Sequence, residues 1–409
     1  MSYKIFTLMN KNTPICDLAY NTEGHFCSEI RQVWNAAYAS PAMIERGRGL
    51  TEDAFNAWWR GRAIPLTRKG MEYVLDRLAI SDTRMLLEMN HGLSLSDRYW
   101  LNDGSTNWSD VNYFGNDFTD DLGMITLQSG NAQEYGRMTS RPEDLQEQDN
   151  TGMRDSQLAM LNPSSSLNGN MKKKWAIDPD GTRVMYKKAS GLFGLDVYGE
   201  CVATALFENL LVPGDYVPYE VRSDADGVYA VCPNMLGEDE ELVTVYDLLV
   251  NDFSYAKNHF SHMLKAVNAT GVPGAEGFLN RMFLCDFLIA NSDRHYRNFG
   301  LIRNVETLEY TRMAPVFDSG NALWGDTVTL NPQKAHEYYA KPFGNAFGEP
   351  ALELLGELTD VKCVDLNKMK DFYPVAEKIL RNIPALSENR AQVTLDAIRH
   401  QTEMIYSRS

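Results

Sequence analysis

The sequence lacks paired cysteines. Structural zinc sites are typically built from CxxC pairs, and disulfide frameworks are typical of short secreted chains. The six cysteines lie far apart along 409 residues and form no such pair: Cys16, Cys27, Cys201, Cys232, Cys285 and Cys363. Their spacing disfavours a zinc site or a disulfide framework and favours a reducing cytoplasm.

Long apolar runs are also missing. No stretch approaches the roughly 20 uninterrupted apolar residues that a membrane-spanning helix needs. The first residues, MSYKIFTLMNKNTPIC, become polar too early to hold the apolar core of a signal peptide. We therefore expect a soluble cytoplasmic protein without membrane association.

Basic residues are too few for broad binding to nucleic acid. The 39 Lys and Arg residues face 55 Asp and Glu residues, for a net charge of −16. This balance disfavours direct nucleic-acid binding, and with it a DNA-associated repressor built on the first 150 residues. The exception is a basic run between residues 171 and 188, which is either a solvated surface or a phosphate-binding segment. Its members are Lys172, Lys173, Lys174, Arg183, Lys187 and Lys188.

Apolar residues make up 44% of the chain, so the sequence is that of a folded protein with room for two or three domains. A β-rich block with one helix is expected to precede a largely helical block that residues 291–330 interrupt, which is the profile of a bilobal kinase. The expected strands cover residues 3–9, 173–177, 183–187, 216–221 and 228–232, and the expected helices cover residues 51–59, 70–78 and 195–211. Residues 129–170 are polar and are expected to form a linker.

The segment NSDRHYRNFG, residues 291–300, carries the clearest chemical pattern. It follows an expected buried helix over residues 276–290, and Asp293 precedes Asn298 by five residues. Kinase catalytic loops place a base and a metal-binding Asn at this separation. Downstream, Asp318 follows the apolar run APVF and precedes Ser-Gly, a setting expected of a metal-binding aspartate. Each feature alone could be an ordinary turn or strand exit, but together and in this order they favour phosphoryl transfer.

Together, NSDRHYRNFG and RMAPVFDSGNAL resemble the HipA-like serine/threonine kinases. The catalytic motif of that family reads N-x-D-R-H-x-x-N-x-G, and its metal aspartate follows Pro-x-Tyr/Phe. Upstream, SSSLNGNMKKKW looks like the family's phosphate loop, VMYK its strand lysine, GECVA the start of its glutamate-bearing helix, and VCPN its adenine-binding hinge. The resemblance covers roughly residues 160–330.

This resemblance implies a site for ATP and Mg²⁺. Asp293 would be the catalytic base with His295 in support beside it, and Asn298 and Asp318 would bind the metal. Lys188 stays open as an alternative to Lys187 for the phosphate lysine, although period-2 alternation along the strand favours Lys187. The residues implied in nucleotide binding are Asn168, Gly169, Lys173, Lys187, Glu200, Cys232 and Asn234.

The implied fold class is α+β, a bilobal protein-kinase-like fold. It would comprise an N-terminal accessory region (residues 1–150), a β-rich N-lobe (151–240) and an all-helical C-lobe (241–409), the HipA-like C-terminal domain. The implied function is that of an ATP- and Mg²⁺-dependent kinase acting on a protein substrate with a Ser/Thr acceptor, as a toxin whose candidate partner is an antitoxin. The alternatives are a pseudokinase scaffold and a kinase-fold enzyme that modifies a small molecule or transfers AMP.

Members of this family can autophosphorylate a serine in the phosphate loop, which ejects the loop and inactivates the enzyme. Ser166 occupies the matching place, and the alternative interpretation is a flexible serine-rich turn. The chain also departs from the family pattern. Residues 1–150 do not align with the family's antitoxin-binding subdomain, which leaves the partner open, and Pro233 in the hinge lacks an N–H for adenine.

Overall fold

The computed structural model describes residues 2–68, 71–78, 80–118, 162–167, 171–251, 259–341 and 348–408. The chain divides into two compact units. Unit 1 comprises Met1–Ala39, Met43–Lys188 and Leu236–Glu238, and unit 2 comprises Ser40–Ala42, Ala189–Met235 and Asp239–Ser409. The three regions expected from the sequence stay a prediction. Asn168, Gly169 and most of the expected linker lie outside the described residues.

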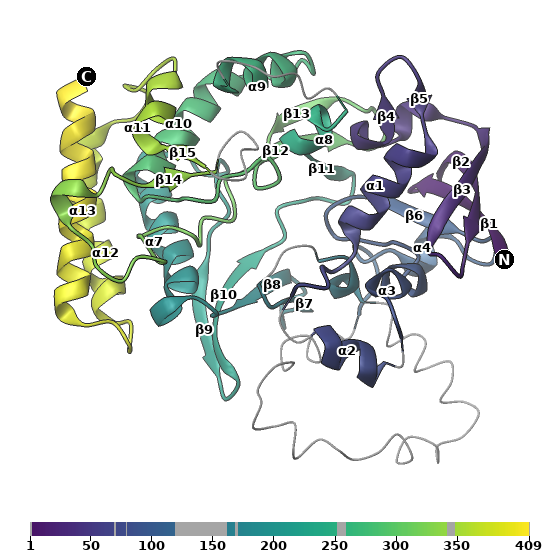
Figure 1. The fold of residues 1–409 in the computed structure, drawn as a ribbon, viewed down its shortest axis with the longest axis horizontal. Coiled ribbons are helices and arrows are strands. Elements are labelled where there is room, and N and C mark those ends of the chain that lie inside the picture. The colour runs from purple at the N-terminus through teal and green to yellow at the C-terminus, as the bar shows by residue number, and fades with distance from the viewer. Residues whose placement is uncertain are drawn as a thin grey trace. The chain divides into compact units, whose positions relative to one another are not determined.

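Unit 1 contains an antiparallel sheet of four strands in the order β3-β2-β1-β6, with α1 packed against β3 (Figure 1). The side chain of Thr51 caps α1 by accepting a hydrogen bond from the Ala54 N–H at 3.3 Å. Phe55 and Trp59 of this helix lie in the same buried cluster as Leu8 and Leu18 of the sheet. The elements before the hairpin are β1 (Tyr3–Asn10), β2 (Thr13–Asn21), β3 (Phe26–Val33), β4 (Ile44–Glu45), β5 (Gly49–Leu50), α1 (Glu52–Arg62), α2 (Met71–Arg77), α3 (Thr83–Met89), β6 (Tyr99–Asn102) and α4 (Trp108–Val111).

The expected strand–turn–strand of the basic run is present in unit 1. Strands β7 (Lys173–Ile177) and β8 (Arg183–Lys188) pair antiparallel, with Lys173 opposite Lys187. The turn between them is closed by a hydrogen bond of 2.8 Å from the Gly181 N–H to the Asp178 carbonyl. Gly181 has a φ of +87°, a conformation that favours glycine. The short helix η4 (Pro163–Ser166) contacts β7.

Unit 2 is built on four helices that share one core: α7, α10, α12 and α13. Helix α12 packs on both α7 and α13 (Figure 1). The elements of unit 2 are α7 (Leu195–Leu210), β9 (Glu220–Asp224), β10 (Gly227–Pro233), β11 (Glu240–Thr244), α8 (Val245–Leu249), α9 (His259–Asn268), α10 (Ala275–Leu288), β12 (Gly300–Asn304), β13 (Tyr310–Met313), β14 (Tyr339–Ala340), β15 (Glu349–Pro350), α11 (Ala351–Glu357), α12 (Met369–Arg381) and α13 (Glu388–Arg408). None of the helices in the described residues has the length and apolar character that crossing a bilayer requires.

The expectation of an all-helical region after residue 240 is wrong. Strands β11, β12 and β13 form an antiparallel sheet there, and β14 pairs with β15. Glu241 and Arg303 stand opposite each other on β11 and β12 and form a buried ion pair with an N–O distance of 2.5 Å. Such charged residues in the middle of short strands interrupt the alternation of apolar and polar residues by which a strand is recognised.

Strand β9 also begins later than expected, at Glu220 instead of residue 216. The preceding residues make a different contact, because the Val217 N–H donates to the Val316 carbonyl at 2.9 Å and Tyr216 forms a parallel bridge with Val316. This bridge connects the segment before β9 to the run that leads into Asp318.

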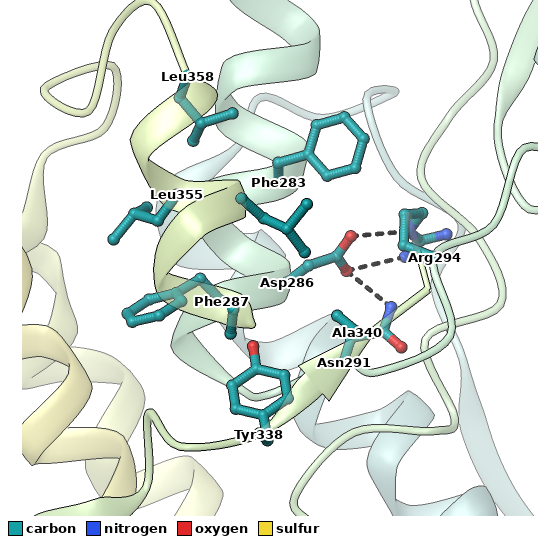
Figure 2. A pocket seen from close by; sticks show the side chains of 11 residues that line it. Phe283, Asp286, Phe287, Asn291, Arg294, Tyr338, Ala340, Leu355 and Leu358 are labelled. Carbon is teal, nitrogen blue, oxygen red and sulfur yellow. Dashed lines mark hydrogen bonds and ion pairs between the residues drawn. The ribbon is translucent and has the colours of Figure 1, made fainter. Parts of the chain in front are cut away.

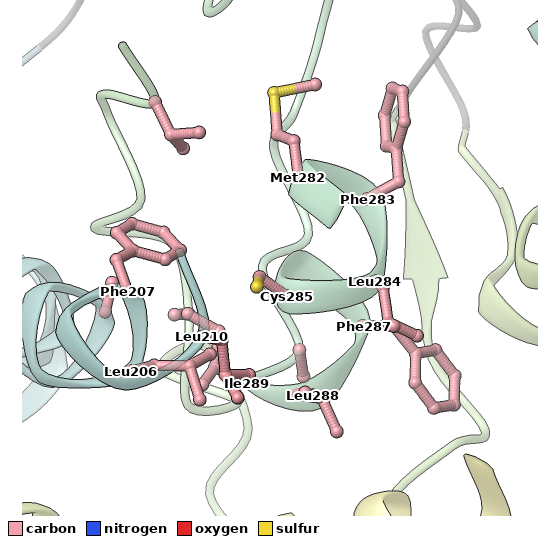
Figure 3. Packing of buried hydrophobic residues seen from close by; sticks show 14 of the residues in the cluster. Leu206, Phe207, Leu210, Met282, Phe283, Leu284, Cys285, Phe287, Leu288 and Ile289 are labelled. Atoms are coloured by element: carbon pink, nitrogen blue, oxygen red, sulfur yellow. The ribbon is translucent and has the colours of Figure 1, made fainter. Parts of the chain in front are cut away.

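Helix α10 is the centre of the unit 2 core. Phe278, Leu279, Met282 and every residue from Phe283 to Leu288 are buried. Figure 3 shows residues of α10 and the following Ile289 facing Leu206, Phe207 and Leu210 of α7. A helix that is apolar on nearly all sides is stable only inside a core. The one carboxylate on its buried C-terminal turn, Asp286, therefore needs a partner, and that partner lies in the loop that follows.

Candidate functional site

The end of α10 sets the direction in which the chain enters the loop of residues 291–298. The Asn291 N–H donates to the Asp286 carbonyl at 2.8 Å and the Ala290 N–H to the Phe287 carbonyl at 3.1 Å. These two bonds form a Schellman motif, which needs a left-handed residue at the position of Ala290. Ala290 has a φ of +52°, so an alanine adopts a conformation that glycine usually takes. The loop thus starts from a defined direction at the buried end of the core helix.

Arg294 connects this loop to α10. Its guanidinium makes two hydrogen bonds to the Asp286 carboxylate, Nε to Oδ2 at 2.8 Å and Nη2 to Oδ1 at 3.0 Å (Figure 2). Asn291 Nδ2 donates to the same Oδ1 at 2.8 Å. Both charged groups are almost fully buried. Burial by itself would lower the pKa of Arg294, but the carboxylates of Asp286, Asp318 and Glu200 together outweigh it, so the pKa lies above its usual value.

The same guanidinium also bonds to the two predicted metal-binding segments, at Asn298 itself and at the residues on either side of Asp318. Its Nη1 donates to the Asn298 carbonyl at 2.7 Å and to the Phe317 carbonyl. Its Nη2 donates to Ser319 Oγ at 2.8 Å. One side chain therefore fixes the loop of Asn298 and the segment of Asp318 relative to each other. A planar group with five N–H donors can do this, whereas a lysine cannot.

Asp293 and Asn298, predicted as base and metal ligand, are in direct contact. Asn298 Nδ2 donates to the Asp293 carbonyl at 2.9 Å. Asn298 as a whole is 7% exposed, and the side chain of Asp293 is 24% exposed. The sequence spacing of five residues therefore closes a short turn that presents the Asp293 carboxylate and the Asn298 amide from one loop.

His295 lies beside the Asp293 carboxylate, with Nε2 4.0 Å from Oδ2. Burial lowers the pKa of His295 below its usual value of 6.5, while the carboxylates of Asp293 and Asp318 act in the opposite sense. A neutral ring fits the other contact, because the Arg297 N–H donates to Nδ1 at 3.2 Å and the ring proton then sits on Nε2. A separation of 4.0 Å is too long for a hydrogen bond, which fits the predicted supporting role.

Two residues that the sequence did not suggest complete the surroundings of Asp293. Asn321 Nδ2 donates to Asp293 Oδ2 at 3.0 Å, and Lys341 Nζ lies 3.4 Å from Oδ1. No hydrogen bond to Oδ1 occurs among the described residues, so the contact with Lys341 is an ion pair without hydrogen-bond geometry. The two carboxylate oxygens thus stand in different environments.

Asp318 sits in a strained backbone conformation with a φ of +57°. Strain of this kind persists where the surroundings determine it, and it is frequent at functional sites. The Asp318 N–H donates to Tyr219 Oη at 3.4 Å, and the next N–H, that of Ser319, donates to Glu200 Oε2 at 2.8 Å. Glu200 is 1% exposed on α7. It was predicted to pair with Lys187, and that pairing stays a prediction.

Two glycines allow the segment of Asp318 to approach α7. A Cβ on Gly320 would lie 2.6 Å from the Asp196 carbonyl oxygen, and a Cβ on Gly199 would lie 2.9 Å from the Gly320 carbonyl oxygen. Real Cβ atoms essentially never come that close to backbone atoms, so neither position admits a side chain without a backbone shift.

We expect Gly320→Ala to destabilise the protein by about 1–3 kcal/mol, because the methyl group overpacks a backbone contact. The matched control is Gly356→Ala on α11, where nothing lies within 4 Å of the added Cβ. That change should stabilise the helix by about 0.5–1 kcal/mol. Urea unfolding of the two variants measures both effects. Equal stabilities of Gly320→Ala and wild type would contradict the close approach.

The remaining predicted residues lie on other elements. In unit 1, Lys187 is buried, Lys188 and Lys173 are half-buried, and Ser166 is partly exposed at the end of η4. In unit 2, Cys232 is buried near the end of β10 and Asn234 follows Pro233.

In the part of the chain that the structure describes, no three His, Cys, Asp or Glu side chains gather in a way that could hold a metal ion by themselves. A pocket next to the loop is lined by Phe283, Asp286, Phe287, Asn291, Arg294, Tyr338, Ala340, Ala351, Leu354, Leu355 and Leu358.

Comparison with protein-family models and with curated protein sequences finds no match. Two solved structures are similar to the chain. The toxin–antitoxin system HipA, HipB and its operator DNA from Shewanella oneidensis MR-1 matches with a TM-score of 0.52 and 12% identity, over 98% of this chain and 97% of that chain. The proinflammatory kinase CtkA of Helicobacter pylori matches with a TM-score of 0.42 and 18% identity, over 58% of this chain and 93% of that chain. This chain, which contains both helices and sheets, is therefore similar in fold to the Shewanella structure over nearly its whole length.

Proposed function

We propose that this chain is an ATP- and Mg²⁺-dependent serine/threonine protein kinase of HipA-like type, with a bilobal arrangement. The observation that carries the proposal is the contact between Asp293 and Asn298. The Asn298 amide nitrogen is used in the bond to the Asp293 carbonyl, which leaves the amide oxygen as the ligand atom for a metal. Kinase catalytic loops use an Asp and an Asn at this separation as base and metal ligand.

Asp293 would act as the base. Oδ2 is held by Asn321, so the carboxylate is oriented before a substrate arrives, and it would accept the proton of a Ser or Thr hydroxyl. The hydroxyl oxygen forms a bond to the γ-phosphorus while the bond from that phosphorus to the β-γ bridging oxygen breaks, and ADP leaves. His295 would stabilise the loop from the side.

Asn298 and Asp318 would hold Mg²⁺. Both offer oxygen ligands, and Mg²⁺ commonly takes one or two protein carboxylates or amides and completes its shell with water and phosphate oxygens. The bound ion would neutralise charge on the phosphates. The assignment of these two metal ligands is supported by the Arg294 side chain, which donates to the backbone carbonyls of Asn298 and Phe317 at the same time.

The proposed nucleotide contacts follow the family resemblance. Lys187 would bind the α- and β-phosphates, and its burial beside a half-buried Lys188 favours it as the phosphate lysine. Glu200 would pair with Lys187, and Cys232 and Asn234 would flank the adenine. Asn168, Gly169 and Lys173 would bind phosphate.

One experiment separates this proposal from its rivals. The protein is incubated with Mg²⁺ and ATP labelled at the α or the γ position, in wild type and in Asp318→Ala. Label from the γ position alone, lost in the variant, supports a kinase. Label from the α position would mean AMP transfer, and ATP binding without transfer would mean a pseudokinase scaffold. Transfer to small molecules but to no protein would indicate a small-molecule kinase.

The proposed setting is cytoplasmic, with the chain acting as a toxin and an antitoxin as its partner. Support comes from the similar Shewanella structure, whose HipA stands in a complex with HipB and operator DNA. The net charge of −16 disfavours direct contact of this chain with DNA. Its physiological protein substrate would carry a Ser or Thr acceptor.

Ser166 is the proposed site of inhibitory autophosphorylation. Ser166 is partly exposed and its hydroxyl donates to the Pro163 carbonyl at 3.1 Å, whereas Ser164 and Ser165 are fully buried. We expect mass spectrometry after incubation with MgATP to find phosphate on Ser166 and not on its two neighbours. Asp293→Asn treated in the same way controls for a contaminating kinase. An unmodified Ser166 in protein that actively phosphorylates other acceptors would refute the site.

A further inference from the structure

Three segments that are distant in the sequence meet at the Asp293 carboxylate. Asn321 follows the predicted metal ligand Asp318, and its carbonyl accepts the Ser292 N–H at 3.1 Å in addition to the side-chain bond with Asp293. Lys341 follows β14, and its N–H donates to the Ser292 carbonyl at 2.9 Å. The residue before Asp293 is therefore bonded through its backbone to both of the residues that contact the carboxylate.

These contacts fix the backbone position of Lys341. Its backbone is tied to Ser292, and the preceding residues, Tyr339 and Ala340, pair with β15. The side chain is 53% exposed, and its ammonium lies 3.4 Å from Asp293 Oδ1. Lys334, seven residues earlier, is 63% exposed and lies 3.5 Å from Glu337. That pair is local, because its partner is only three residues along the chain and the Glu337 N–H donates to the Lys334 carbonyl at 2.9 Å.

We propose that Lys341 is a positioning residue for the catalytic step, acting through Asp293. The inference rests on the proposed kinase function. Asn321 holds Oδ2 by a hydrogen bond, and the Lys341 ammonium attracts Oδ1 without taking up its hydrogen-bonding position. The carboxylate is thus held from both sides, while Oδ1 is buried and accepts no hydrogen bond from the described residues. Small displacements of a reacting group lower catalytic rates strongly, so a contact of this kind affects turnover more than stability.

The test compares Lys341→Met, Lys341→Arg and the control Lys334→Met with wild type, using transfer from γ-labelled MgATP. Lys341→Met should lower kcat about 10–100-fold with little change in the KM for ATP. Lys341→Arg, which keeps the charge, should stay within a few-fold of wild type. The melting temperatures of all three variants should match wild type, since exposed ion pairs contribute only about 0–1 kcal/mol.

A second measurement asks whether Lys341 acts through Asp293. In an Asp293→Ala background, adding Lys341→Met should lower the residual transfer rate by less than about twofold, because the two changes remove the same contact. A full additional loss in that background, an unchanged kcat in Lys341→Met alone, or a loss that parallels a lower melting temperature would each overturn the proposal. No transfer by the wild-type protein would refute the kinase function itself, and the role of Lys341 with it.

Discussion

Asp293→Asn is expected to lower γ-phosphoryl transfer about 10²–10⁴-fold, the range that a positioned general base contributes. The substitution is nearly isosteric. The amide oxygen can keep the bond from Asn321 Nδ2, so the loop should stay folded. It removes the negative charge and the proton acceptor at the Oδ1 position, which is the oxygen without a hydrogen bond in the described residues. Rates of label transfer from γ-labelled ATP measure the loss.

The control for this variant is Asp326→Asn, which changes the same atoms on an exposed residue of unit 2. It should transfer at the wild-type rate. ATP affinity should be unchanged in both variants, because Asp293 is proposed to contact the acceptor hydroxyl and not the nucleotide. A tenfold or smaller loss in Asp293→Asn would mean that another group is the base, with His295 the nearest candidate at 4.0 Å.

Arg294→Met should cost about 3–5 kcal/mol of stability, the typical penalty for leaving one charge of a buried ion pair without its partner. Asp286 would lose two hydrogen bonds from the guanidinium and keep only that from Asn291. The carbonyls of Asn298 and Phe317 would lose a donor as well. The free energy of unfolding in urea measures the effect. Arg381→Met, which breaks an exposed pair with Glu377 on α12, should change it by about 0.5 kcal/mol or less.

The double variant Arg294→Met with Asp286→Leu separates stability from activity. Replacing both charges of a buried pair by apolar groups is often close to neutral, so much of the lost stability should return. Transfer activity should not return, because no donor then holds the two backbone segments that carry the predicted metal ligands. Recovery of both properties would show that Arg294 serves the fold alone. A double variant less stable than Arg294→Met would contradict the assignment of the penalty to an unpaired Asp286.

Local patterns predicted the local structure well. The turn signal Asp-Gly at residues 180–181 and the alternation around it predicted the β7–β8 hairpin, and the apolar stripe of residues 202–210 predicted α7. The spacing of Asp293 and Asn298 predicted two residues that the structure brings into contact within one turn. Each of these features depends on neighbours only a few residues apart, which the sequence displays directly.

The contacts that the sequence did not suggest join distant segments. Asn321 and Lys341 reach Asp293 from 28 and 48 residues away, and nothing in their own neighbourhoods distinguishes them from surface residues. The buried ion pair between Glu241 and Arg303, which joins two short strands, was also not evident from the sequence. Asp286 did leave a signal, because a lone carboxylate on the last turn of a helix that is otherwise apolar requires a buried partner. In the structure Arg294, eight residues later, is that partner.

Arg294 holds backbone carbonyls at Asn298 and Phe317 instead of the side chains that the proposed chemistry uses. This part of the framework is thus independent of the side chain at residue 318. A descendant of this chain could exchange Asp318 by a single mutation and still keep these contacts, with the altered side chain presented from the same backbone. Loss of catalysis would then be a short evolutionary step, and the retained frame would stay available for selection towards a different chemistry.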